Sequence, residues 1–355
     1  MREEFIEFLK SGSVSMSELC RRFGISRKTG YKWKRRYGEC GRAGGGAGGV
    51  EWSGDRSRRP RGCPHRSSAE MEAEVLAARA EHPAWGGRKL KHLLESRGYR
   101  GVPAASTITS ILRRGGLLES HGSGPVRAGS YQRFEREAPN ELWQMDFKGE
   151  FRTQRAGYCY PLGMLDDHSR YNLMLEARGD QRTHGVRASL GEAFRRYGLP
   201  RQLLCDNGPP WGTSAEGGSG YTELGVWLLG LGVDIIHGRA YHPQTQGKQE
   251  RFHRSLKAEV LSRPAPWEDL REVGEAFQQW RRVYNHQRGH EALQMRPPGE
   301  VYAPSPRRAR EGLLEGALPE MPYHEADTVR TVNALGRVMY KNRTYMIGRA
   351  FQKKP

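Results

Sequence analysis

The sequence predicts a multidomain protein with helical modules at the amino end, an α/β domain with a mixed sheet in the middle and a small β unit at the carboxyl end. Three observations support this prediction. Short amphipathic helices separated by turn residues fill the first third of the chain, apolar strands alternate with helices from Glu141 onward, and a short alternating pattern closes the chain. Its 355 residues allow two or three domains.

The first module, residues 1–40, contains a predicted helix-turn-helix in the segment SELCRRFGISRKTGYKWKRRY. Ser17 is the expected cap of its first helix, Gly24 supplies the turn, and Ser26 is the expected cap of the second helix. That second helix has many cations and no acid, which suits the major groove of DNA, although a solvated basic helix would look the same. Its expected DNA-binding residues are Arg27, Lys28, Tyr31, Lys32, Lys34 and Arg35.

A second helical module, residues 69–120, follows a Gly-, Arg- and Pro-rich stretch at 41–68 that predicts a flexible basic linker. The last of its expected helices has a Ser or Thr start and ends in Arg113-Arg114-Gly115-Gly116, so a second helix-turn-helix is predicted. The expected helices cover 71–81, 88–96 and 106–114. Residues 121–139 form another expected linker.

The α/β domain is predicted over residues 140–303, because alternating apolar segments at this point are followed by a helix and a further strand. A Gly-rich insertion, GTSAEGGSG, interrupts the domain. Strands are expected at 142–151, 158–166, 171–177, 202–206 and 233–236, and helices at 183–197, 224–231, 246–261 and 270–284. The tail, 304–355, contains a β unit expected to turn at Asn-Arg or Leu-Gly.

The charge of the chain favours a polyanionic partner. The formal net charge is +18 and the pI about 9.9, and residues 1–140 hold 27 basic against 15 acidic side chains. No run of about 18 apolar residues suggests a membrane helix, and the acidic start MREEFIEFLK does not resemble a signal peptide, so we expect the chain to stay in the cytoplasm. The five cysteines lack metal-site spacing and are expected to be reduced.

Three carboxylates stand out. Asp146 lies in the otherwise apolar strand segment ELWQMDF, Asp206 ends the strand RQLLCD before an Asn-Gly turn, and Glu250 lies in the first turn of a helix. Each alone has an ordinary explanation as an edge, turn or surface residue. Together, two strands and a helix would provide the oxygen ligands that two hard divalent ions need for phosphoryl transfer.

The motifs that surround these acids resemble those of insertion-sequence transposases with a retroviral-integrase-like core, the DDE group of the ribonuclease H fold. The matching segments are NELWQMDF at 140–147, LDDHSR at 165–170, CDNG at 205–208, HPQTQGKQERFHRSLK at 242–257 and YNHQRGHEAL at 284–293. One departure is the spacing of 43 residues between Asp206 and Glu250, which exceeds the usual pattern and fits the Gly-rich insertion.

The resemblance implies that Asp146, Asp206 and Glu250 are the catalytic metal ligands and that Lys257 contacts the DNA end. Lys248 and Arg254, beside Glu250, are expected to bind DNA as well. The implied cofactor is Mg²⁺, with Mn²⁺ as a substitute, and nearby histidines are expected to be structural or to contact DNA, because hard ions favour oxygen.

The function that follows is a DNA transposase. It would bind the terminal inverted repeats of a mobile element, cleave the 3′ ends with metal-activated water and transfer the freed hydroxyl to target DNA. Its partners are double-stranded DNA and further copies of itself, with no membrane and no small-molecule substrate. Two alternatives remain open: a DNA-binding regulator whose α/β domain has lost catalysis, and a structure-selective or RNA-cleaving nuclease on the same fold.

Overall fold

A computed structural model describes residues 1–42, 53–55, 66–118, 135–212, 221–237, 247–317, 319 and 323–354. The predicted linkers 41–68 and 121–139 and the Gly-rich insertion fall mostly outside the described residues, as do residues 242–246 of the HPQTQGKQE motif. The chain divides into two compact units, Met1–Arg66 and Ser67–Pro355. The finer domain boundaries given above stay predictions.

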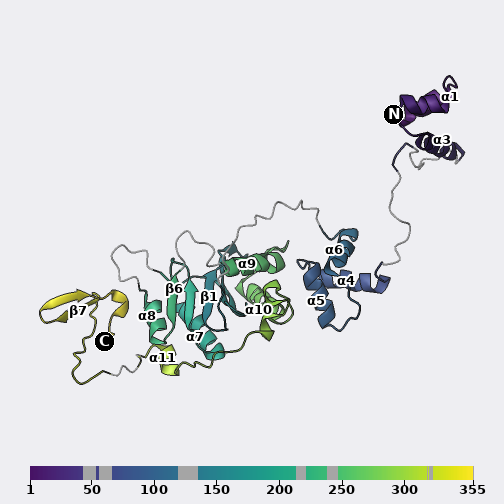
Figure 1. Cartoon of the computed structure of the whole chain (residues 1–355). Helices are drawn as coiled ribbons and strands as arrows, with labels where there is room; N and C mark the ends of the chain where they lie inside the picture. Colours follow the sequence, from purple (N-terminus) through teal and green to yellow (C-terminus); the bar gives the residue numbers. More distant parts are fainter. Residues whose placement is uncertain are drawn as a thin grey trace. The chain divides into compact units, whose positions relative to one another are not determined.

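The described residues of the amino-terminal unit form three helices that share one small core, and Figure 1 labels two of them, α1 and α3. Gly24 takes a positive φ of 63° at the turn between the second and third helices, as the helix-turn-helix prediction requires. Phe5 and Ile6, on a first helix that the sequence analysis did not identify, are buried in this core with Leu19. The helices are α1 (Arg2–Lys10), α2 (Met16–Arg22) and α3 (Arg27–Arg42).

The caps of these helices confirm one prediction and correct another. The Ser26 Oγ accepts a hydrogen bond from the backbone N–H of Thr29 at 3.2 Å, so Ser26 caps α3 as predicted. The predicted cap Ser17 is wrong, because Ser15 has the extended backbone of a cap and its Oγ accepts from the Glu18 N–H at 3.3 Å. The first helix of the motif therefore begins one residue before Ser17, at Met16.

Three more helices open the second unit. They pack around a core that includes Trp85, Leu90 and Ile108. The last of them has Ala104 at its cap position and no side-chain cap, so the polar start predicted for it is wrong. These helices are α4 (Ala69–Glu81), α5 (Gly87–Ser96) and α6 (Ala105–Arg114).

The α/β part of the second unit is built on a mixed sheet whose main strand order is β4-β3-β1-β5-β6. The pairs β1–β3 and β3–β4 are antiparallel, whereas β1–β5 and β5–β6 are parallel. This is the topology of the ribonuclease H fold, and it confirms the predicted fold class. The strands are β1 (Leu142–Phe147), β2 (Phe151–Arg152), which pairs with the start of β3, β3 (Tyr158–Asp166), β4 (Asn172–Arg178), β5 (Gln202–Cys205) and β6 (Asp234–His237).

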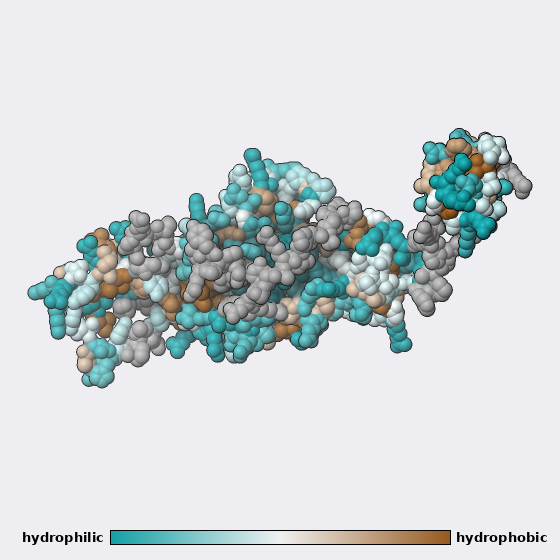
Figure 2. Space-filling model, turned by 45° about the horizontal axis from the view of Figure 1, so that its top comes forward, coloured by the Kyte–Doolittle hydropathy of each residue, from teal (hydrophilic) through white to brown (hydrophobic). Residues whose placement is uncertain are grey.

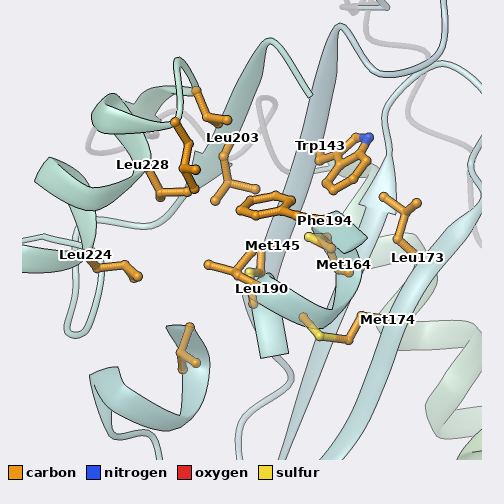
Figure 3. Close-up of a cluster of buried hydrophobic side chains, with 14 of the residues drawn as sticks. Trp143, Met145, Met164, Leu173, Met174, Leu190, Phe194, Leu203, Leu224 and Leu228 are labelled. Atoms are coloured by element: carbon orange, nitrogen blue, oxygen red, sulfur yellow. The ribbon is translucent and has the colours of Figure 1, made fainter. Parts of the chain in front are cut away.

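Helices cover both faces of this sheet. Trp143, Met145 and Leu203 point to one face, where they pack with Leu190 and Phe194 of the helix α7 (Figure 3). The other face is covered by α9 and α10, and its core includes Leu165 and Phe252. The helices are α7 (Thr183–Tyr197), α8 (Glu223–Gly230), α9 (Gly247–Leu256), the π-helical η2 (Lys257–Leu261), α10 (Leu270–His286) and α11 (Glu311–Glu315), with short 3-10 turns η3 (Glu291–Leu293), η4 (Pro298–Glu300) and η5 (Arg349–Phe351).

One polar pair fixes α10 to the sheet. The side-chain amide of Asn285 accepts from the backbone N–H of Asn172 at 2.8 Å and donates to the carbonyl of the same residue at 3.0 Å. Asn285 therefore satisfies both backbone groups of a buried strand residue, which would otherwise cost free energy. This explains why a polar residue stands in the buried part of the YNHQR motif.

The predicted carboxyl-terminal β unit is present as a pair of antiparallel strands, β7 (Arg337–Tyr340) and β8 (Arg343–Met346). Its turn differs from the prediction, because Lys341 and Asn342 hold the two positive φ angles, 45° and 60°, of the two-residue connection. No described helix is both long and apolar enough to cross a membrane. Figure 2 shows hydrophilic residues over much of the described surface, with hydrophobic residues in smaller patches.

Candidate active site

The sheet places Asp146 and Asp206 on neighbouring strands. β1 and β5 run parallel with Leu142 opposite Gln202 and Gln144 opposite Leu204. The same register, continued by two residues, brings Asp206 opposite Asp146. Because parallel strands end at the same edge of a sheet, the two carboxylates lie together at the carboxyl edge of β5, where sites form in α/β folds.

The two aspartates interact electrostatically, and burial acts on both. Burial and, second, the negative charge of Asp206 raise the pKa of Asp146 to about 7. Burial also raises the pKa of Asp206, against the effect of a hydrogen bond from the Gly208 backbone. The Asp206 Oδ1 atom is buried and has no hydrogen-bond partner among the described residues. A buried carboxylate oxygen without a partner is costly unless something binds to it.

The third candidate acid, Glu250, belongs to a different element. It lies in the first turn of α9, and its side chain is exposed. α9 contacts β1, and the Glu250 charge contributes, after burial and Asp206, to the raised pKa of Asp146. Even so, within the described parts of the chain no three His, Cys, Asp or Glu side chains are gathered closely enough to hold a metal ion.

A glycine allows α9 to approach the sheet here. Gly163 of β3 lies opposite Asp146 in the antiparallel pair. A Cβ at this position would lie 3.0 Å from the Phe252 ring and 3.2 Å from the Gln249 Nε2, both on α9. The Gln249 amide instead donates to the Gly163 carbonyl at 3.1 Å, which fixes the residue next to Glu250 against the strand.

His253 lies one helical turn after Glu250 and faces inward. Its Nδ1 is 3.9 Å from the Asp146 Oδ2. Burial lowers the pKa of His253 to about 4, so the ring is neutral near pH 7. The side chain is buried, which fits the predicted structural role better than a DNA contact.

The predicted DNA-binding residues are not all alike in the structure. Arg254 and Lys257 have exposed side chains, and Lys257 opens the π-helical turn η2. On α3, the six predicted residues are also exposed. Trp33, which the sequence pattern interleaves with these cations, is instead buried in the core of the first unit.

Lys248 differs from the other predicted DNA contacts. Its Nζ lies 2.6 Å from the Asp167 Oδ2, and its side chain is largely buried. Sequence reasoning missed this pair and the partners of Asp167 around it. The signal that could have found it was the polar run in LDDHSR, because two adjacent aspartates at the end of an apolar strand need partners when both are buried.

Comparisons with known proteins agree with this arrangement. Two models of the integrase core domain match residues 136–243 and 231–298. A helix-turn-helix domain model matches residues 1–45, and a homeodomain-like domain model matches residues 29–112. The chain is therefore similar to integrase core domains over residues 136–298 and to helix-turn-helix and homeodomain-like domains over parts of residues 1–112.

The similar curated proteins are retroviral polyproteins. The chain is 30% identical over 190 residues to the Gag-Pol polyprotein of baboon endogenous virus, which covers 52% of this chain and 10% of that protein. It is 32% identical over 136 residues to the Gag-Pol polyprotein of feline leukemia virus, with 38% and 7% covered. The chain therefore spans only a small part of these relatives. Over these residues it is similar to proteins that carry an integrase core domain.

Two solved structures are similar to this chain at low sequence identity. One is the simian T-cell lymphotropic virus intasome in complex with the PP2A regulatory subunit B56 gamma, with a TM-score of 0.41, 12% identity and 78% of this chain and 95% of that chain covered. Another is the HTLV-2 integrase catalytic core domain in complex with magnesium, with a TM-score of 0.35, 13% identity and 47% and 99% covered.

Proposed function

We propose that this protein is a DNA transposase that binds the terminal inverted repeats of a mobile element, cleaves the 3′ ends and transfers them into target DNA. The observation that carries the proposal is the unpartnered, buried Oδ1 of Asp206 beside Asp146, at the carboxyl edge of an integrase-type sheet. Two neighbouring buried carboxylates, one of which raises the pKa of the other, are typical of a site for a divalent cation.

The residues of the edge fit Mg²⁺, with Mn²⁺ as a substitute. Asp146, Asp206 and Glu250 would hold the cation through carboxylate oxygens, which hard cations prefer. Three ionised carboxylates repel one another, so the proposal requires the exposed Glu250 to approach the two aspartates as the cation binds. When bound, a pair of such ions activates the attacking oxygen and stabilises the leaving oxygen of a phosphodiester.

The protein's own contribution is to bind and align DNA. The exposed cations Arg254 and Lys257 follow Glu250 along α9 and η2, and we propose that they bind the backbone of the element end. The exposed face of α3 would read the duplex, with its first residues at the base edges and its later cations at phosphates. No protein nucleophile is needed, because water and then the 3′ hydroxyl attack in line.

Joining two element ends requires at least two active sites, so we propose that the protein acts as a homo-oligomer on DNA. The same proposal places it with the nucleoid in the cytoplasm of a bacterial-type cell. The net charge of +18 supports DNA as the partner.

The test uses duplex DNA that carries the element's own end, purified protein and Mg²⁺ or EDTA. We expect nicking and joining by the wild type in Mg²⁺ only, and a loss of both in Glu250→Gln with DNA binding retained. Glu275→Gln is the matched control, because Glu275 is an exposed glutamate on α10, a different helix from the one that carries Glu250; it should cut like the wild type.

Two results would replace the proposal. If wild type and Glu250→Gln bind the end equally and neither cuts with any divalent ion, a DNA-binding regulator is the better explanation. If the wild type cuts RNA or irregular duplexes but never joins a 3′ end to target DNA, it is a nuclease on the same fold.

A further inference from the structure

Asp167, in the turn directly after β3, is a buried carboxylate. Its side chain has 0% exposure, and the Lys248 side chain that pairs with it has 16%. The Lys248 ammonium donates to the Asp167 Oδ2 at 2.6 Å and to the Asp167 backbone carbonyl at 3.1 Å. These residues are 81 positions apart in the sequence, so the pair joins two distant elements.

Asp167 also binds groups from the other side. The Gln144 Nε2 donates to its Oδ1 at 2.6 Å, and the Arg136 backbone N–H donates to its Oδ2 at 2.9 Å. Gln144 is itself buried in β1, two residues before Asp146. Because side chains two apart in a strand share a face, Gln144 and Asp146 lie on the same face of β1.

A continuous polar chain therefore runs from β1 through Asp167 to α9. At its two ends, Gln144 and Lys248 each precede a candidate catalytic carboxylate, Asp146 or Glu250, by two residues. Lys248 is the second residue of α9, in the turn where a helix lacks its own backbone hydrogen bonds and frays most easily. A buried ion pair at this point holds the first turn against the sheet.

We propose that Lys248 is a positioning residue, whose pair with Asp167 fixes the first turn of α9 and thereby the place of Glu250 relative to Asp146. The Lys248 ammonium pairs with the buried Asp167 carboxylate. If the ammonium moved to DNA, this carboxylate would be left buried without a cation. This differs from the DNA contact expected from the sequence. The inference rests on the proposed function insofar as Glu250 is taken to be catalytic.

The first test measures hydrogen exchange in the purified full chain without DNA or metal. Lys248→Met should speed amide exchange over Gly247–Leu256 by at least about tenfold and leave β1 and β3 unchanged, because local opening of the first turn no longer breaks an ion pair. Lys248→Arg should restore most of the protection. Arg251→Met is the control, since it removes an exposed cation from the same helix.

Asp167→Asn removes the other partner. If the pair acts as a unit, Asp167→Asn and the double variant with Lys248→Met should speed exchange over α9 about as much as Lys248→Met alone, because changes in one interaction are not additive. Asp167 is fully buried, so Asp167→Asn can lower the stability of the whole protein. In that case the exchange of α9 in the Lys248 variants alone tests the proposal. Protection of α9 that is unchanged in Lys248→Met would overturn the proposal.

The second test separates positioning from DNA contact. A positioning residue predicts that Lys248→Met raises the Mg²⁺ concentration for half-maximal nicking, with unchanged affinity for element-end DNA. A phosphate contact predicts weaker DNA binding and a salt slope reduced by about 1, with α9 still protected. If the wild type never cuts DNA, the proposed function fails, whereas the exchange measurement still tests the Lys248–Asp167 pair.

Discussion

Gly163 lies directly opposite Asp146 in the antiparallel pair of β3 and β1, and α9 lies against it. The absence of a side chain at this strand position is what brings the helix that carries Glu250 to the strand that carries Asp146. A glycine inside a strand often marks such a close approach.

Gly163→Ala should therefore lower activity more than it lowers stability. The added Cβ would meet the Phe252 ring at 3.0 Å and the Gln249 Nε2 at 3.2 Å, so α9 must shift by a few tenths of an ångström. We expect the rate of strand joining to fall at least about tenfold, since small misplacements of catalytic groups are costly, while circular dichroism still shows a folded protein.

Gly274→Ala is the matched control for this change. A Cβ at Gly274, on α10, meets nothing within 4 Å, and alanine in a helix is favoured over glycine by about 0.5–1 kcal/mol. This variant should join strands normally and be slightly more stable. Equal activity of the two variants would show that the approach of α9 at Gly163 does not matter for the reaction.

The buried ion pair between Arg288 and Glu259 predicts a large loss of stability when one partner is removed. The Arg288 Nε lies 3.1 Å from the Glu259 Oε1, and each side chain is only 8% exposed. Glu259→Gln should lower the free energy of unfolding by about 3 kcal/mol or more, because it leaves a buried guanidinium without its counter-charge. Urea unfolding followed by tryptophan fluorescence measures the change.

An exposed ion pair of similar geometry gives the comparison. Arg155 and Glu268 lie 2.8 Å apart but are 74% and 51% exposed. Glu268→Gln should change the free energy of unfolding by less than about 1 kcal/mol. If Glu259→Gln lowers the free energy of unfolding no more than Glu268→Gln does, the structural role of the buried pair is contradicted.

The lowered pKa of the buried His290 leads us to expect that the folded protein loses stability in mild acid. Burial, followed by the charge of Arg288, lowers its pKa from 6.5 to about 2. The Arg288 Nη1 is 3.2 Å from the His290 Nε2, and because arginine can only donate, that nitrogen accepts and the ring is neutral. The other charges that lower this pKa are those of Lys89, Arg170 and Arg251, all cations.

The sign of the pH effect follows from proton binding. Between pH 6.5 and about 2 the unfolded chain binds a proton at His290 and the folded chain does not, so the contribution of His290 is complete above pH 6.5 and is lost as the pH falls. Between about pH 6 and 4, His290→Asn should reduce the slope of stability against pH by about 1.4 kcal/mol per unit. The exposed His184, changed to Asn, is the control; equal slopes in wild type and His290→Asn would refute the assignment.

Removing an exposed lysine from α3, in the unit Met1–Arg66, should change the salt dependence of DNA binding. Lys28 and Lys32 are exposed on α3, and removing one lysine–phosphate interaction reduces the slope of log affinity against log salt by about 0.9. Lys28→Ala or Lys32→Ala should show this reduction in fluorescence anisotropy titrations with an uncut duplex. Lys10→Ala, which removes a cation from α1 beside the Tyr37 ring, should leave the slope unchanged.

Sequence patterns predicted the α/β core closely because its elements are long and regular. The strand at 158–166 and the helix at 183–197 have the bounds found in the structure, since hydrophobic alternation and the turn glycine Gly198, with a φ of 78°, mark their ends. The two aspartates followed from the same reasoning, because each lies at or beside a strand end.

The features that could not be predicted depend on distant partners. Lys248 looked like one more cation on a basic helix, because periodicity describes a helix face and not what packs against it. Its partner Asp167 comes from another element. Trp33 likewise lies among cations in the sequence but fills the core between α1 and α3, where its ring meets Phe5 at a centroid distance of 5.3 Å.

The most direct test of the account places sulfur at the scissile phosphate of the element end. Because Mg²⁺ binds oxygen in preference to sulfur and Mn²⁺ accepts both more readily, the account predicts that a phosphorothioate slows nicking in Mg²⁺ and that Mn²⁺ restores it. Asp206→Asn should abolish both the reaction and the rescue. Nicking that proceeds equally with oxygen or sulfur in Mg²⁺, or that continues in EDTA, would contradict a cation held by Asp146, Asp206 and Glu250 at the reacting phosphate.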